Sequence, residues 1–205
     1  MAIQSDASLL THTDGLQRCW WCGSDPVYVG YHDTEWGVPE YDSRALFEKL
    51  LLDGFQAGLS WITILRKRDG FRAAFDGFDP ERMACYTEAK LEALMQNAGI
   101  VRNRQKIEAS VTNAQSYLAL MEEQSFADYL WGFVDGVPVD SRFASRSAIQ
   151  PSTPLAETIS EDLKQRGFRF CGPTIVYAFM QACGLYNDHL AGCHRHGAVQ
   201  ALAHR

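Results

Sequence analysis

Apolar residues recur at helical spacing along most of the chain. After a capping pair at Asp42–Ser43, Leu46, Phe47, Leu50 and Leu51 fall on one stripe, because residues three and four apart share a face of an α-helix. Further helices are predicted at 61–65, from 79, from 87, at 100–118, at 126–133, at 154–167 and at 173–183. No stretch alternates like a half-buried β-strand, so the pattern predicts an all-α bundle.

A tight turn at 97–101 separates two of these predicted helices. Gly99 is placed to stop the first helix, and the apolar Ile100 follows it. Backbone N–H groups beside a glycine can approach a phosphate, and the positive end of the second helix points the same way. Arg102 and Arg104 add charge there. The turn therefore suggests a helix-hairpin-helix that binds the DNA backbone; the alternative is an ordinary helical hairpin, which also tolerates glycine.

Length and composition indicate one compact core, because the chain has 205 residues of which 46% are hydrophobic. We expect residues 1–17 to form a disordered extension, residues 18–197 a single all-α domain that can have two lobes, and residues 198–205 a tail. No apolar run approaches the roughly 20 residues that span a bilayer. The first residues also lack the pattern of a signal peptide. These features predict a cytoplasmic protein.

The formal charge of −6 argues against a generally basic nucleic-acid-binding surface, although it leaves room for a local one. Basic residues gather in three short clusters, at Arg66, Lys67 and Arg68, at Arg102, Arg104 and Lys106, and at Lys164, Arg166 and Arg169. Each cluster can also be a solvated helix end. Charge alone therefore does not decide whether DNA is a partner.

Cysteines and histidines gather near both ends of the chain, where they suggest a metal site. His189 and Cys193 are four residues apart, and Cys19 and His32 lie near the other end. Thiolate and imidazole are the preferred ligands of zinc, and structural sites take four of them. These residues make a Cys₂His₂ set that would join the two ends, with a structural rather than a catalytic role. Cys22 could replace Cys19 or His32.

Two alternatives to a metal site remain, a redox dithiol and a scatter of unrelated thiols and surface histidines. Cys19 and Cys22 form a Cys-x-x-Cys pair, which can also be a redox dithiol, but no βαβ pattern surrounds it. The other cysteines, Cys85, Cys171 and Cys183, sit among apolar neighbours and are expected to be small buried hydrophobes.

Aromatic residues with polar tips are mixed with carboxylates in two segments, 25–37 and 53–61. They are Tyr28, Tyr31, Trp36 and Trp61. Such rings hold a flat base by stacking, and a cationic base gains about 0.5–2 kcal/mol more from the ring faces. Composition alone favours the other interpretation, an aromatic core with its polar tips at the surface.

Five runs resemble one family, the bacterial 3-methyladenine DNA glycosylases of the constitutive type: YVGYHDTEWGVPE, GFQAGLSWITIL, NAGIVRNRQKI, RGFRFCGPTIVYAFMQACG and NDHLAGC. The likeness covers roughly residues 18–193. It implies a monomeric, all-α helix-hairpin-helix glycosylase that acts on alkylated double-stranded DNA and carries one structural zinc ion. It implies zinc ligands at Cys19, His32, His189 and Cys193, and a hairpin at 97–102 that grips the DNA backbone.

The resemblance also implies a base pocket formed by Tyr28, Tyr31, Trp36 and Trp61, with a carboxylate at Asp53. The family pattern has Glu at this position, and Asp is shorter by one methylene. The expected catalytic pair is Asp53, which would accept a hydrogen bond from the exocyclic amine, and Tyr31 beside it. Trp61 and Tyr28 would stack on the flipped base.

Three further expectations concern the reaction. Leu59 would fill the vacated place in the DNA stack as an apolar wedge. The hairpin contains no lysine for a Schiff base, which favours simple hydrolysis without strand cleavage, and Asp128 is expected to be a helix-capping surface residue.

The alternatives to an enzyme are a non-catalytic protein that binds DNA lesions and a zinc or thiol module that binds a protein partner.

Overall fold

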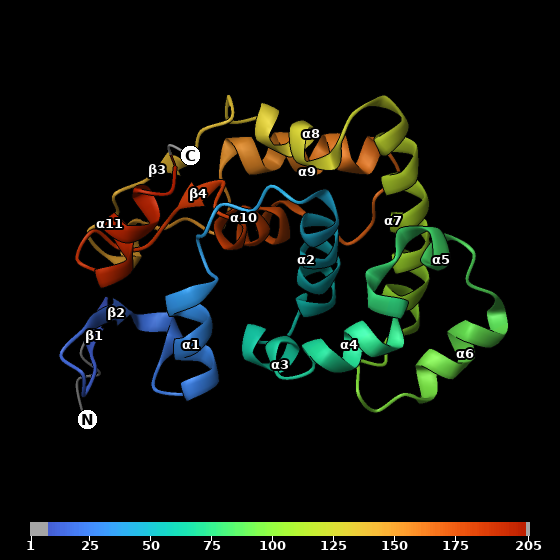
Figure 1. Cartoon of the computed structure of the whole chain (residues 1–205), viewed down its shortest axis with the longest axis horizontal. Coiled ribbons are helices and arrows are strands. Elements are labelled where there is room, and N and C mark those ends of the chain that lie inside the picture. The colour runs from blue at the N-terminus through green and yellow to red at the C-terminus, as the bar shows by residue number, and fades with distance from the viewer. Residues whose placement is uncertain (1–7, 204–205) are drawn as a thin grey trace. The chain divides into compact units, whose positions relative to one another are not determined.

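The computed structural model describes residues 8–203, and these residues are mostly helical, as the sequence predicts (Figure 1). The chain divides into two compact units. Unit 1 consists of Met1–Pro39, Val137–Pro151 and Met180–Arg205, and unit 2 of Glu40–Gly136 and Ser152–Phe179. No helix among the described residues is long and apolar enough to cross a membrane.

Unit 2 is built from helices. Its elements are α2 (Ser43–Gln56), α3 (Trp61–Leu65), α4 (Arg68–Ala74), the 3₁₀ helix η2 (Asp76–Phe78), α5 (Pro80–Ala84), α6 (Glu88–Gln96), α7 (Arg104–Glu123), α8 (Phe126–Gly132) and α9 (Pro154–Gln165). Helix α10 (Pro173–Ala182) begins in unit 2 and ends in unit 1. The long helix α7 packs against α2, α5, α6 and α8, and therefore supports the turns that leave α2 and α6.

The predicted start of α2 and its apolar stripe are confirmed. The Asp42 side chain accepts a hydrogen bond from the Ala45 N–H, which satisfies one of the unpaired donors at the helix start. The predicted stripe residues are all buried, and Phe47 packs on Tyr117 of α7 with ring centroids 4.5 Å apart. Asp79 and Thr87 cap α5 and α6 in the same way. Local capping residues and apolar periodicity thus determine where these helices begin and which face of α2 is buried.

Unit 1 contains short strands that the periodicity does not predict. Its elements are β1 (Leu9–Thr11), β2 (Gln17–Cys19), η1 (Trp20–Cys22), α1 (Pro26–Thr34), β3 (Val139–Asp140), η3 (Arg146–Ala148), β4 (Tyr186–Asn187) and α11 (His194–Gln200). Strands β1 and β2 pair antiparallel, with Leu9 opposite Cys19, and β3 and β4 pair parallel. Strands of two or three residues are too short to show alternation, and the described residues remain mostly helical, which is consistent with the predicted all-α class.

The two predicted tails also differ from the structure where it describes them. Residues 1–7 and 204–205 lie outside the described residues, but residues 8–17 hold β1 and the start of β2 rather than a disordered extension. Leu9 packs on the cluster formed by Cys19, Leu190 and Cys193. In the C-terminal tail, Val199 of α11 is 1% exposed. Contacts with residues distant in sequence order both segments, and a local pattern cannot reveal them.

Candidate functional site

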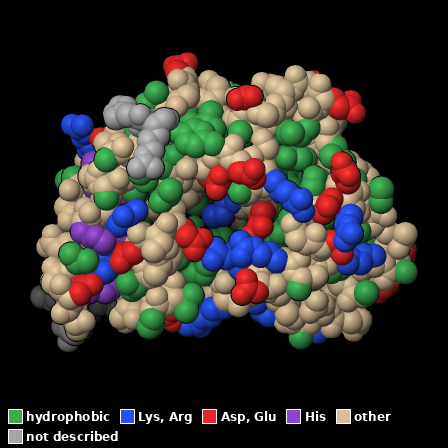
Figure 2. Space-filling model, viewed as in Figure 1, with side chains coloured by type: hydrophobic (Ala, Val, Ile, Leu, Met, Phe, Trp, Pro, Cys, Tyr) green, Lys and Arg blue, Asp and Glu red, His purple; other side chains and the backbone are tan. Residues whose placement is uncertain are grey.

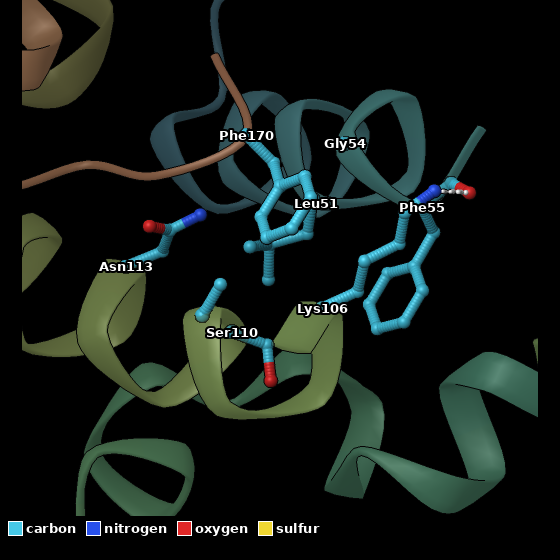
Figure 3. Close-up of a pocket in the computed structure, with 8 residues that line it drawn as sticks. Leu51, Gly54, Phe55, Lys106, Ser110, Asn113 and Phe170 are labelled. Atoms are coloured by element: carbon cyan, nitrogen blue, oxygen red, sulfur yellow. Dashed lines mark hydrogen bonds between the residues drawn. The ribbon is translucent and has the colours of Figure 1, made fainter. Parts of the chain in front are cut away.

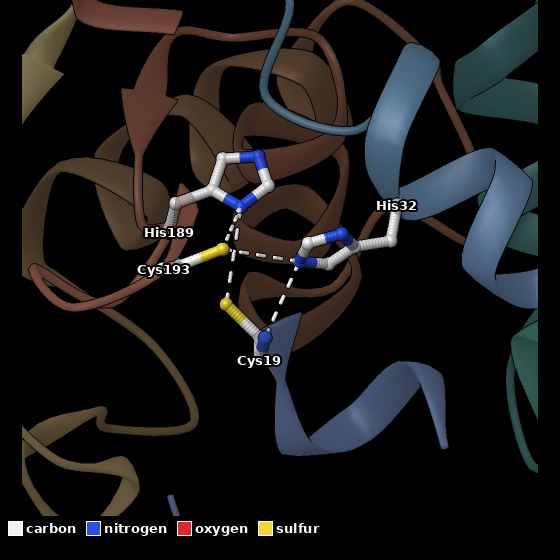
Figure 4. Close-up of side chains that lie close together, drawn as sticks. All are labelled: Cys19, His32, His189 and Cys193. Carbon is white, nitrogen blue, oxygen red and sulfur yellow. Dashed lines mark hydrogen bonds between the residues drawn. The ribbon is translucent and has the colours of Figure 1, made fainter. Parts of the chain in front are cut away.

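Four buried side chains of unit 1 converge as the spacing predicts (Figure 4). Cys19 ends β2 and His32 lies on α1, while His189 and Cys193 come from the segment between β4 and α11. Their ligand atoms, two sulfurs and two nitrogens, all lie within 4.8 Å of one another. The group therefore joins chain segments from the two ends of the sequence.

The spacing of these atoms fits a tetrahedral metal ion. Cys193 Sγ lies 3.5 Å from His32 Nε2 and 3.6 Å from His189 Nδ1, and Cys19 Sγ lies 3.8 Å from His189 Nδ1. Zinc–sulfur and zinc–nitrogen bonds of ordinary length in a tetrahedron separate sulfur from nitrogen by about 3.5 Å. Two thiols and two imidazoles with this separation can hold zinc without rearrangement.

The other nitrogen of each imidazole is already held. His32 Nδ1 lies 2.8 Å from a carboxylate oxygen of Asp33, and His189 Nε2 donates to the carbonyl oxygen of Trp36 at 2.9 Å. Asp33 is itself held by Arg18 at 2.7 Å. Such outer contacts fix which nitrogen faces a metal. They leave His32 Nε2 and His189 Nδ1 pointing into the group.

The two thiols of the group interact with each other. Their mutual hydrogen bond and burial raise the pKa of Cys19, whereas contacts with Cys19 and with both histidines lower the pKa of Cys193. A divalent cation bound by both sulfurs would favour both thiolates. Cys22 is not part of the group, since its thiol donates to the Cys19 carbonyl oxygen at 3.2 Å.

A second feature of unit 1 is a cluster of aromatic rings around Trp21. Its ring lies 5.1 Å from that of Tyr28, 6.2 Å from that of Tyr31 and 4.9 Å from that of Trp36. The indole N–H of Trp21 is buried and has no hydrogen-bond partner among the described residues. Sequence reasoning assigned Tyr28, Tyr31 and Trp36 to one site and missed Trp21, whose position within Cys-x-x-Cys suggested only metal or redox chemistry.

The cluster contacts the group of Cys19, His32, His189 and Cys193 through Trp36. The Trp36 ring packs on His189 at 4.6 Å between centroids, in addition to the carbonyl contact. Gly37 follows with a φ of +83°, and a Cβ there would lie 3.1 Å from the His189 ring. Only glycine meets both conditions easily. The four-ligand group thus helps to fix the orientation of the aromatic rings.

In unit 2, Asp53 is buried on α2 with only 2% of its surface exposed. The Lys49 ammonium, one helical turn earlier, lies 2.8 and 2.9 Å from the two carboxylate oxygens. The same ammonium lies 3.7 Å from the centroid of the Trp61 ring. Burial raises the pKa of Asp53, and the charge of Lys49 opposes that rise. Sequence reasoning identified Asp53 and Trp61 but missed Lys49.

The turn between Asp53 and Trp61 carries Leu59, which is 41% exposed. This turn begins at the end of α2, where Lys106 of α7 donates to the carbonyl oxygens of Phe55 at 2.8 Å and Ala57 at 2.6 Å (Figure 3). Lys106 is buried, and burial lowers its pKa. Lys106 therefore holds the end of α2 rather than contributing to a basic surface cluster.

A turn separates α6 from α7 at the predicted place, although α7 begins at Arg104 rather than at residue 100. Gly99 is exposed, and its N–H donates to the Asn97 side chain at 2.8 Å, whereas Ile100 is buried. Arg102 is exposed. Arg104 instead forms ion pairs with carboxylates of α6 and α7, namely Glu88, Glu92 and Glu108. Its charge is already balanced, which argues against the expected phosphate contact by this residue.

Basic and acidic side chains stand close together on the face shown in Figure 2. Arg166 of the third basic cluster pairs with Asp162 at 2.8 Å and with Glu123 at 3.1 Å. Asp128 is exposed in the first turn of α8, as expected of a surface residue, but it does not cap the helix: Ser125 does, because its hydroxyl accepts from the Asp128 N–H at 2.9 Å. In the three predicted basic clusters, the exposed residues are Arg66, Arg102, Lys164 and Arg169.

A family model and two curated relatives identify the same family. The model of the methyladenine glycosylase family matches residues 21–196. The chain is 50% identical to DNA-3-methyladenine glycosylase 1 of Escherichia coli, over 87% of this chain and 96% of the relative. It is 47% identical to the DNA-3-methyladenine glycosylase of Haemophilus influenzae, over 86% and 96%.

Solved structures agree. A crystal structure of 3-methyladenine DNA glycosylase I superposes with a TM-score of 0.85 at 54% identity, covering 87% of this chain and 98% of the other. The enzyme from Staphylococcus aureus gives 0.82 at 44% identity, with 83% and 92% covered. A variant solved in complex with 3-methyladenine gives 0.81, with the same identity and coverage. The chain belongs to the methyladenine glycosylase family.

Proposed function

We propose that this protein removes 3-methyladenine from alkylated double-stranded DNA by hydrolysing the bond between the base and its sugar, as the first step of base-excision repair. Relatives about half identical over most of their length bear the name of this activity, and a solved relative binds the free base. Within the chain, the observation that carries the proposal is a buried carboxylate, Asp53, close to an aromatic ring, Trp61. Such a combination suits a cationic purine, whose amine can donate to the carboxylate and whose positive ring is attracted to an aromatic face.

The reaction requires little from the protein beyond recognition of the damaged base. Methylation at N3 gives the base a positive charge, so the base leaves readily once it has been flipped out of the stack. Asp53 would accept a hydrogen bond from the exocyclic amine, and Trp61 and Tyr28 would stack on the rings. Water then bonds to the sugar carbon and loses a proton, while the base keeps the electron pair of the broken bond.

The aromatic cluster of unit 1 is proposed to bind the base as well. Tyr31 is 4% exposed, and Trp36 is tied to His189. We add Trp21 to the set, since its buried indole N–H lacks a partner among the described residues and could donate to a ring nitrogen. Tyr28 stays protonated in this role, because burial raises its pKa to about 12.

Contacts with DNA are proposed for two exposed features of unit 2. Leu59 would enter the stack as a wedge. The hairpin would grip the backbone through Gly99, Ile100 and Arg102 as a helix-hairpin-helix, with Arg104 committed elsewhere. No lysine lies in the hairpin, so the product is an abasic site in an intact strand. We also propose that the protein is a cytoplasmic monomer.

A single structural zinc ion is proposed at Cys19, His32, His189 and Cys193. When bound, it would cross-link the two ends of the sequence and contribute folding energy. The separations of the four ligand atoms and the held outer nitrogens support this choice.

The test is release of free 3-methyladenine from methylated duplex DNA by the purified protein. We expect release with first-order kinetics and no strand break until alkali is added. Strand breaks without alkali would contradict the monofunctional mechanism. No release with retained affinity for methylated DNA would indicate a lesion-binding protein instead, and neither release nor DNA affinity would favour a module that binds another protein.

A further inference from the structure

Lys49 occupies both groups of unit 2 that the proposed function assigns to the base. Its ammonium contacts the two oxygens of Asp53 at 2.8 and 2.9 Å and lies over the Trp61 ring at 3.7 Å. Because Asp53 is buried, this ammonium compensates a charge that would otherwise be costly. The residue is therefore more than a surface partner.

A cationic purine offers the same two interactions as this lysine. Its exocyclic amine donates to a carboxylate, and its positive ring system is attracted to an aromatic face. The cationic base and the Lys49 ammonium would repel each other at such short range. They also cannot both occupy the space beside the Asp53 carboxylate and the Trp61 ring. The base and the Lys49 ammonium therefore exclude each other at Asp53 and Trp61.

We infer that Lys49 is an intramolecular competitor for the base: its ammonium leaves Asp53 and Trp61 when the cationic base enters, and returns when cleavage has made the base neutral. This inference rests on the proposed function, because the change in charge comes from the reaction. Lys49 thereby determines how readily the neutral product is released.

The charges balance through the reaction. Breaking the bond between C1′ of the sugar and N9 of the base leaves the electron pair on the base, which cancels its positive charge. The oxygen of water bonds to C1′, and a proton passes to solvent. The neutral product still donates to Asp53 but has lost the attraction between opposite charges, whereas Lys49 keeps its full charge. The ammonium is therefore the stronger partner after cleavage.

The position of Lys49 allows this exchange. Lys49 and Asp53 are four residues apart and share one face of α2. The lysine has a flexible four-carbon stem, and its side chain is 16% exposed against 3% for that of Asp53. It can swing towards solvent without disturbing the helix, while the carboxylate stays in place.

Unit 2 contains a similar trio that serves as a matched control. Lys90 contacts Asp76 at 3.0 Å and lies 4.8 Å from the centroid of the Tyr86 ring. Both charged side chains there are about a third exposed, and no base-binding role is assigned to them. Loss of Lys90 therefore removes the same kinds of contact as loss of Lys49, one with a carboxylate and one with an aromatic ring.

The experiment measures binding of free 3-methyladenine by calorimetry at pH 8, with wild type, Lys49→Met, Lys49→Arg and Lys90→Met. We expect Lys49→Met to bind the product about tenfold more tightly or better, which corresponds to about 1.4 kcal/mol. Its turnover number under multiple-turnover conditions should fall relative to its single-turnover rate. Lys49→Arg keeps a competing cation and should restore the wild-type pattern, and Lys90→Met should match wild type.

Equal or weaker product binding by Lys49→Met would overturn the inference, because a lysine that only supports Asp53 would give that result. If the wild type releases no 3-methyladenine from DNA, the proposed function itself fails, and this inference fails with it. If the wild type releases the base and Lys49→Met shows no change in affinity, only the inference is wrong.

Discussion

In unit 1 four ionisable side chains face one another, whereas in unit 2 one buried carboxylate faces a lysine of its own helix. The ligand atoms of unit 1 are held from behind by Asp33 and by the Trp36 carbonyl oxygen, so they are fixed before any ion binds. In unit 2 the partner of Asp53 is a flexible side chain. The first arrangement suits a permanent ion, and the second suits a ligand that comes and goes.

The largest effect should come from breaking the group of unit 1. Cys193→Ala removes one of four ligands, so we expect metal content to fall well below one ion per chain and the free energy of unfolding to fall by about 3–5 kcal/mol. Metal analysis and urea unfolding measure both quantities. Cys22→Ala is the control, because Cys22 is a buried thiol outside the group. Full metal content in Cys193→Ala would refute the assignment.

Loss of an outer contact should have a smaller effect. Asp33→Asn weakens the hold on His32, and we expect metal affinity to fall about 10- to 100-fold, as measured by competition with a chelator. The matched control is Asp140→Asn, because Asp140 contacts His196 at 3.0 Å and His196 is not one of the four ligands. Equal affinity in both variants would mean that Asp33 does not position the ligand.

In unit 2, Lys106 tests whether the turn before Trp61 is fixed from outside. Lys106→Met leaves the carbonyl oxygens of Phe55 and Ala57 without their donor, and we expect a loss of about 1–3 kcal/mol in unfolding free energy. Lys90→Met, at an exposed site, should cost less. A loss no greater than that of the control would show that the end of α2 does not depend on Lys106.

The smallest effect is expected at a partly exposed pair of unit 2, Asp76 and Lys90. Hydrogen bonds from Tyr86 and Lys90 hold the pKa of Asp76 below its ordinary value of 3.8. A group with a lowered folded pKa stabilises the protein above the unfolded pKa, and this contribution disappears as the pH falls through the folded pKa. Asp76→Asn should therefore cost at most about 1 kcal/mol at pH 6. The difference from wild type should shrink towards pH 3, and a difference that grows on acidification would contradict this.

The helices of unit 2 could be predicted because their signals are local. Asp42, Asp79 and Thr87 cap where the sequence suggests, and apolar spacing identifies the buried stripe of α2. The strands of unit 1 could not be predicted from the sequence, because they are too short to show alternation. They also depend on distant contacts, such as that of Leu9 with the Cys19 cluster.

The candidate site was predictable to the extent that its residues have distinctive chemistry. Spacing and residue type pointed to Cys19, His32, His189 and Cys193 but left Cys22 as an alternative, which only the contacts in the structure exclude. Lys49 and Asp33 were missed because lysine and aspartate are common, and Trp21 was missed because it lies within Cys-x-x-Cys; only their contacts show what these residues do. Lys49 had one available signal, its position four residues before Asp53.

The most direct test of the account compares single-turnover release of 3-methyladenine from methylated DNA by wild type, Asp53→Asn and the surface variant Asp128→Asn. We predict that Asp53→Asn releases the base about 100-fold more slowly than wild type, with unchanged metal content, and that Asp128→Asn matches wild type. Wild-type rates in Asp53→Asn would contradict the central claim that this buried carboxylate recognises the damaged base.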